Sequence, residues 1–179
     1  MGTDKAVLVV GGAPLARIAA NALARAGAVD VVAVGGDEPW LRAIGLRHVP
    51  DIHPVEGPLG WILTAMGSTD AAIVVVLACD LPSVTAATVR TVVGGLHGSD
   101  GYSGADVAVA VAGGRPQWLC AAWRRATAGP VLAEAFATGQ RAVHRAVSAL
   151  TLVEVAVPAG AAADVDYPSD LPRPAGDER

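Results

Sequence analysis

An aspartate closes the most apolar stretch of the chain. The run AAIVVVLA covers residues 71–78, and Asp80 follows it after a single cysteine. A continuous β-branched run is typical of a strand buried on both faces, and α/β proteins bind ligands beyond the carboxyl ends of such strands. A carboxylate in that place can hold Mg²⁺ against the phosphates of a substrate. Alternatively, Asp80 caps the turn or helix that follows, and its position alone leaves both interpretations open.

Two more carboxylates lie near the carboxyl terminus. Asp164 and Asp166 belong to ADVDYPSDL, residues 163–171, and alternate residues of an extended chain share one face. Two carboxylates on one face are unfavourable unless a cation lies between them or water solvates both. Taken alone, these residues favour a solvated turn before a helix that Pro168 would open.

A further acidic residue lies between an expected strand and an expected helix. Asp51 follows LRHV, residues 46–49, and Gly57 and Pro58 then mark the start of the helix. Glycine lets a substrate approach the backbone, and the amino-terminal end of a helix favours anions. An ordinary strand-to-helix loop explains the same residues. Lys5, near the beginning of the chain, does not by itself indicate a function.

The stretch VLVVGGAPLAR, residues 7–17, is similar to the start of a dinucleotide-binding fold. Its GGAPLA turn does not match the G-x-G-x-x-G pattern that brings a backbone close to pyrophosphate. Asp30 stands at about the distance expected for a ribose-binding acid, but it falls inside the apolar run VDVVAV rather than at its end. These residues therefore disfavour a dinucleotide site.

Composition limits the class of protein further. The 179 residues are 53% hydrophobic and 17% charged, with a net charge of −4, which excludes a disordered chain and offers no basic surface for nucleic acid. The longest apolar stretch, 71–79, is too short to cross a membrane, and the first residues lack the order of a signal peptide. We interpret Cys79 and Cys120 as buried thiols of a reducing compartment, so we expect a cytoplasmic protein.

Apolar runs alternate with helical patterns along the chain, which predicts an α/β fold with a mainly parallel sheet. The expected strands are 7–10, 29–34, 46–49, 71–78 and 151–157, with a hairpin-like pair over 105–124. The expected helices are 14–26, 38–43, 57–66, 85–97, 128–137 and 139–148. Ligands are then expected where Gly35, Gly36, Asp51 and Asp80 follow their strands.

Six segments follow one another in a fixed order: MGTDKAVLVVGGAPL, VPDIHPVEGPLGWI, VLACDLP, GGRPQWLCAAWR, TGQRAV and DVDYPSDL. Their order and spacing resemble the molybdenum cofactor guanylyltransferase family and its nucleotidyltransferase relatives, from Met1 to about Leu171. The resemblance implies a three-layer α/β/α domain over residues 1–171, of the Rossmann-like kind found in nucleotide-diphospho-sugar transferases. Residues 172–179 would form a loose tail.

The resemblance also implies that the phosphate-binding loop is not the GGAPLA turn. In that family A-G-G-x-S-x-R and the strand before it precede G-x-D-K, and the backbone amides of this loop bind the triphosphate. Met1 and Gly2 align with the M-G of that motif, so GGAPLA follows the loop rather than forming it. We expect a sequence that starts inside a longer reading frame. One alternative is a divergent member of the family that has lost catalysis. The other is that VLVV takes the role of the missing segment.

The resemblance implies roles for several residues. Lys5 would contact the nucleotide phosphates and stabilise charge on the transferred phosphoryl group, and Asp51 would contact the nucleotide. Asp80 would bind Mg²⁺, and Asp166 could add a second metal contact because DVD stands where guanylyl enzymes have N-V-N. Arg141, in TGQRAV, would be an anion contact on the acceptor side.

Gly35 and Gly36 would lie at the nucleotide, where the family often has an asparagine. The implied reaction is attack by the terminal phosphate of the molybdenum pterin on the α-phosphate of GTP. The implied partners are a nucleoside triphosphate, a molybdopterin-type small molecule and proteins of molybdoenzyme maturation. A related nucleotidyltransferase with another base or acceptor is favoured by the two glycines and by DVD. A non-catalytic homologue that binds a ligand or partner is favoured by the absent loop.

Overall fold

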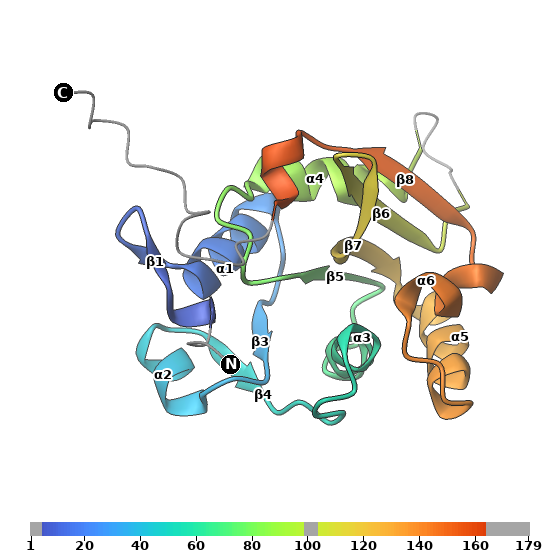
Figure 1. Ribbon diagram of the computed structural model, residues 1–179, viewed down its shortest axis with the longest axis horizontal. Coiled ribbons are helices and arrows are strands. Elements are labelled where there is room, and N and C mark those ends of the chain that lie inside the picture. Colours follow the sequence, from blue (N-terminus) through green and yellow to red (C-terminus); the bar gives the residue numbers. More distant parts are fainter. Residues whose placement is uncertain (1–4, 99–103, 164–179) are drawn as a thin grey trace.

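The computed structural model describes residues 5–98 and 104–163, which form helices and strands in alternation (Figure 1). The helices are α1 Leu15–Ala26, α2 Glu38–Ala43, α3 Pro58–Gly67, α4 Ala86–Gly95, α5 Arg125–Ala137 and α6 Val143–Ala146. The strands are β1 Val9–Val10, β2 Ala13–Pro14, β3 Val32–Val34, β4 Arg47–Val49, β5 Ile73–Leu77, β6 Val107–Ala112, β7 Arg115–Arg124 and β8 Leu152–Ala156.

The main sheet has four strands in the order β5-β7-β6-β8 and is mixed. Strand β7 runs antiparallel to both of its neighbours, whereas β6 and β8 are parallel. The antiparallel pair of β6 and β7 is a hairpin, and Gly113 and Gly114 in its turn both have positive φ, 56° and 76°, which suits a tight hairpin turn. The hairpin expected over 105–124 is therefore present, and it makes the sheet less parallel than the alternating pattern predicts.

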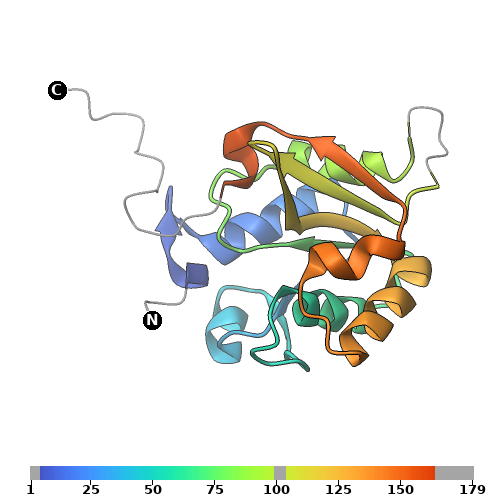
Figure 2. The ribbon, with the colours of Figure 1, turned by 45° about the vertical axis from the view of Figure 1, so that its right-hand side comes forward.

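Helices cover both faces of this sheet (Figure 2). One apolar cluster joins α3, α5 and α6 to the sheet, and a second joins α1 and α4 to its other face. Along β6, Val107 and Val109 belong to the first cluster while Ala108 and Ala110 belong to the second. Successive side chains of a strand point to opposite faces, so this run of small residues is buried on both sides, and the three layers follow.

Strands β3 and β4 form a separate parallel pair, and β1 and β2 form a small antiparallel one. The strand expected at 29–34 is shorter, because the Val29 side chain is 96% exposed and pairing begins only at Val32. The strand expected at 7–10 is reduced to two residues. Gly11 and Gly12, both with positive φ, turn the chain back there into β2.

Glycine and capping residues determine where three of the helices begin or end. Gly27 ends α1 in the left-handed conformation, with φ 105°, as expected for a helix over 14–26. Asp37 accepts a hydrogen bond from the Trp40 backbone N–H and caps α2, which has the expected bounds. The expected helix over 139–148 is shorter, because Gly139 has φ 91° and α6 begins only at Val143.

Two adjacent glycines of α4 provide a test of the packing between this helix and the sheet. A Cβ at Gly95 would lie 2.6 Å from Val155 Cγ2 and 3.0 Å from Ala108 Cβ, whereas a Cβ at Gly94 would meet nothing within 4 Å. Gly95→Ala should lower the free energy of unfolding by about 1–3 kcal/mol through overpacking. Gly94→Ala should raise it by up to about 1 kcal/mol through helix propensity. Urea unfolding of both variants measures the difference, and equal effects would contradict the close packing.

Candidate functional site

Two charged residues from distant segments meet beyond the carboxyl end of β5. Lys5 Nζ lies 3.2 Å from Asp80 Oδ2, although 75 positions separate the residues. The two side chains are 35% and 22% exposed, so water and ligands can reach both charges. A partly exposed pair of this kind adds little to stability, and its opening in favour of a phosphate or a cation therefore costs little.

Asp51 lies at the carboxyl end of the β3–β4 pair and is held in one orientation. Its Oδ1 accepts hydrogen bonds from the His53 backbone N–H at 2.9 Å and from the Thr64 hydroxyl at 3.1 Å. A Cβ at Gly35 would lie 3.5 Å from Asp51 Cβ. The structure thus brings Asp51 and Gly35 together, as the strand-end rule predicts.

Gly35 and Gly36 form a strand end that carries no side chain. Both have positive φ, 69° and 80°, so any other residue would be strained there. The Gly35 N–H donates to the Val49 carbonyl and keeps this turn attached to β4. A ligand that contacts this turn would meet backbone atoms rather than a side-chain amide.

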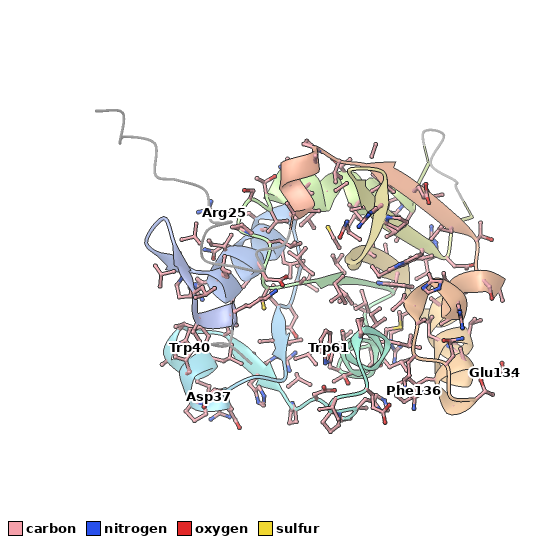
Figure 3. The ribbon with its side chains drawn as sticks, viewed as in Figure 1. Arg25, Asp37, Trp40, Trp61, Glu134 and Phe136 are labelled. Atoms are coloured by element: carbon pink, nitrogen blue, oxygen red, sulfur yellow. The ribbon has the colours of Figure 1, made fainter. Side chains whose placement is uncertain are left out.

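Arg141 is engaged with protein groups on several sides. Its Nε donates to Glu56 Oε2, and its Nη1 donates to the carbonyls of Phe136 and Gln140 at 2.8 and 3.0 Å. The guanidinium carbon lies 3.9 Å from the centre of the Phe136 ring, at the end of α5 (Figure 3). These contacts fix the position of the charge and neutralise part of it.

A cavity of about 370 Å³ brings Arg141 and Asp80 to one space. Trp118 and Gln117 of β7 also line it, together with Cys120 and Val143. An aromatic ring and a cation beside one cavity suit a flat ligand that carries an anionic group. Arg141, which the resemblance places on the acceptor side, is thus one of the residues that line this cavity.

Of the expected metal ligands, Asp80 lies among the described residues. Asp164 and Asp166 lie outside the described residues, and among residues 5–98 and 104–163 no group of three or more His, Cys, Asp or Glu side chains could hold a metal. A single carboxylate such as that of Asp80 is compatible with Mg²⁺, because this ion is usually bound by one or two carboxylates together with substrate phosphates.

Sequence reasoning missed the residues that orient the site. Thr64 is 2% exposed and lies on α3, where its hydroxyl reaches Asp51, but a threonine inside a helical pattern gives no signal of that contact. Glu56 pairs with Arg141 across 85 positions, which no local pattern shows. His53 is half-buried, and the centre of its ring lies 4.5 Å from that of the Phe136 ring.

The two cysteines differ in burial. Cys120 is buried, whereas Cys79 is only half-buried, which corrects the expectation that both are core residues. No disulfide joins them. Burial raises the pKa of Cys120 from 9.0 to about 11, because the interior disfavours the thiolate.

This raised pKa predicts a pH-dependent loss of stability at high pH. The unfolded chain ionises Cys120 near pH 9, and the folded chain only near pH 11, so its contribution is complete below pH 9 and disappears as the pH rises to 11. The loss should approach about 2–3 kcal/mol. Urea unfolding of the native chain and of Cys120→Ala at pH 8, 9, 10 and 11 isolates this effect, with Cys79→Ala as the control. Parallel curves for the native chain and Cys120→Ala would contradict it.

The model of the MobA-like NTP transferase domain family matches residues 1–155. A probable molybdenum cofactor guanylyltransferase of Pelotomaculum thermopropionicum is 37% identical over 109 residues, 61% of this chain and 50% of that protein. The molybdenum cofactor guanylyltransferase of Xanthomonas euvesicatoria is 39% identical over 88 residues, 49% and 43% of the two chains. This chain thus spans about half the length of the curated relatives it matches.

Solved structures show the same fold at low identity. Molybdopterin-guanine dinucleotide biosynthesis protein A from Archaeoglobus fulgidus has a TM-score of 0.70 and 20% identity over 94% of this chain and 87% of that one. The 2-C-methyl-D-erythritol 4-phosphate cytidylyltransferase of Thermus thermophilus has a TM-score of 0.66 and 20% identity over 93% and 89%. These likenesses confirm the expected nucleotidyltransferase-like α/β fold. No helix in the described part of the chain is long and apolar enough to cross a membrane.

Proposed function

This chain belongs to the MobA-like NTP transferase domain family, and on that premise we propose that it transfers a guanylyl group from GTP to a molybdenum-pterin cofactor. The observation that carries the proposal is the contact between Lys5 Nζ and Asp80 Oδ2 at 3.2 Å. It places a cation and a carboxylate together at a strand end, next to the cavity that Arg141 and Trp118 line.

In the proposed reaction, a terminal phosphate oxygen of the pterin attacks the α-phosphorus of GTP. The bond from that phosphorus to the bridging oxygen of the β-phosphate breaks, and pyrophosphate leaves. Lys5 would hold the phosphates and stabilise the charge that develops on them. Asp80 would hold Mg²⁺, whose positive charge would neutralise part of the charge on the phosphates.

The remaining side chains would bind and orient the two substrates. Asp80 would hold the metal ion, and Asp166 is proposed as its second protein ligand. Asp51, oriented by Thr64, would contact the nucleotide beside Gly35. Arg141, already fixed by Glu56, would offer its remaining charge to the phosphate of the acceptor.

A second candidate differs in the nucleotide or in the acceptor. Gly35 and Gly36 present backbone atoms where a side-chain amide would distinguish guanine, which favours a related nucleotidyltransferase with another base or acceptor. We propose that residues 1–171 act as one nucleotidyltransferase-like domain with residues 172–179 as its tail, and that it works in the cytoplasm. Its partners would be a nucleoside triphosphate, a molybdopterin-type molecule and proteins that mature molybdoenzymes.

Nucleotide binding tests the proposal. The chain should bind GTP weakly in the presence of Mg²⁺, with a Kd on the order of 0.1–1 mM. Asp80→Asn should weaken this binding about tenfold, because it removes the carboxylate that holds the metal. In excess EDTA the Asp80→Asn variant should not bind GTP more weakly than the native chain, because no metal ion is then present for Asp80 to hold. Calorimetry with GTP and with CTP measures these affinities.

The matched control is Asp70→Asn, whose carboxylate is exposed and pairs with Arg125 away from the cavity. This variant should bind GTP as the native chain does. Tighter binding of CTP than of GTP would favour the second candidate. An unchanged affinity of Asp80→Asn for GTP and Mg²⁺ would contradict the role of Asp80.

A further inference from the structure

Glu56 contacts Arg141 without lining the cavity that Arg141 lines. Its Oε2 accepts a hydrogen bond from Arg141 Nε, yet Glu56 is not among the residues around that cavity. The side chains of Glu56 and Arg141 are 43% and 40% exposed, and an ion pair this exposed adds little to stability. The main effect of the Glu56 carboxylate is therefore electrostatic, because it places a negative charge beside the cation of the cavity.

The loop before α3 holds Glu56 in this place although the backbone is strained. Val55, just before it, has φ 61°, the one positive value for a residue other than glycine in the described part of the chain. A β-branched residue stays in that region only where its surroundings hold it. The Glu56 N–H donates to the His53 carbonyl at 3.2 Å. A Cβ at Gly60 would lie 2.8 Å from His53 Cβ and 3.5 Å from Glu56 Cβ, so close packing on α3 fixes the carboxylate.

Arg141 has one nitrogen left for a ligand. Its Nε donates to Glu56, and its Nη1 donates to the carbonyls of Phe136 and Gln140. Nη2 donates to no group in the described part of the chain. The Phe136 ring, at the end of α5 in Figure 3, lies 3.9 Å from the guanidinium carbon. A single nitrogen with two hydrogens suits the oxygens of one phosphate group.

The charges around the cavity indicate the same limit. Asp80 lines the cavity together with Arg141. Lys5 pairs with Asp80, as Glu56 pairs with Arg141, so these four formal charges cancel. An anion therefore gains mainly from its short distance to Nη2 of Arg141. Every further negative charge on the ligand lies farther from this nitrogen and meets no net attraction.

We propose that Glu56 is a specificity-determining residue, which reserves Arg141 for a ligand with a single phosphate and excludes polyphosphates from it. The inference rests on the proposed function, in which the acceptor contributes one phosphate and GTP carries three. The triphosphate is then left to Lys5 and to the metal ion on Asp80. Without the Glu56 charge, Arg141 would attract both substrates, and GTP would compete with the acceptor.

Anion binding by the native chain and by Glu56→Gln tests this role, because glutamine keeps an oxygen for Arg141 Nε but removes the charge. The probes are dimethyl phosphate, methyl phosphate and pyrophosphate, with about one, two and three negative charges at pH 8. In low salt with EDTA, Glu56→Gln should bind all three more tightly. The gain should rise from about threefold for dimethyl phosphate to at least about tenfold for pyrophosphate, as expected for a charge on the order of 6 Å away in water. The indole N–H resonance of Trp118, which lines the cavity, reports binding at this site.

Three further variants isolate the charge. Glu56→Asp keeps a carboxylate near Arg141 and should bind the probes within about twofold of the native chain. Asp70→Asn changes the net charge equally, but at the pair with Arg125, and should bind them as the native chain does. Arg141→Gln should bind all three weakly, whether or not Glu56→Gln is added. Salt at about 1 M should remove most of the gain of Glu56→Gln.

The dependence on ligand charge separates this role from a structural one. Equal gains for the three probes, or weaker binding of all three by Glu56→Gln, would overturn the proposal, because Glu56 would then only hold Arg141 in position. If Arg141→Gln binds the probes as the native chain does, both this proposal and the acceptor role of Arg141 fail. The titration of Asp80→Asn with GTP tests the nucleotide side of the proposed function independently of these results.

Discussion

The hydrogen bonds between β5 and β7 hold β5 in the sheet and fix where its carboxyl end leaves it. Their register places Leu77 opposite Cys120, and the chain then reaches Asp80 at the cavity that Trp118 also lines. Val74 and Val76 pack toward α3 and α5, and Val75 and Leu77 toward α1 and α4. The position of the acidic residue is thus a consequence of strand pairing and of burial on both faces.

The contact between Lys5 and Asp80 is the centre of the candidate site. The two opposite charges partly neutralise each other, yet both side chains remain accessible to solvent. Such a pair can exchange its internal partner for a phosphate or a metal ion without leaving a buried charge unpaired. Arg141 is held by Glu56 and two carbonyls, and it adds a charge at a fixed position to the lining of the cavity that Asp80 also lines.

Local signals predicted local structure well. Asp37 as a cap and Pro39 in the first turn give α2 its expected bounds, and the glycines between β6 and β7 mark the hairpin. The split between the main sheet and the β3–β4 pair could not be read from the apolar runs, since they show which residues are buried but not which edges pair. The same holds for Thr64 with Asp51 and Glu56 with Arg141, because these contacts depend on how separate elements pack.

A double-mutant cycle on Lys5 and Asp80 tests most directly whether the two residues form one centre. Lys5→Met, Asp80→Asn and the double variant are titrated with GTP in the presence of Mg²⁺. If both side chains act on the same phosphates, the loss in the double variant differs from the sum of the single losses by at least about 0.5 kcal/mol. Losses that add within error would contradict a shared centre.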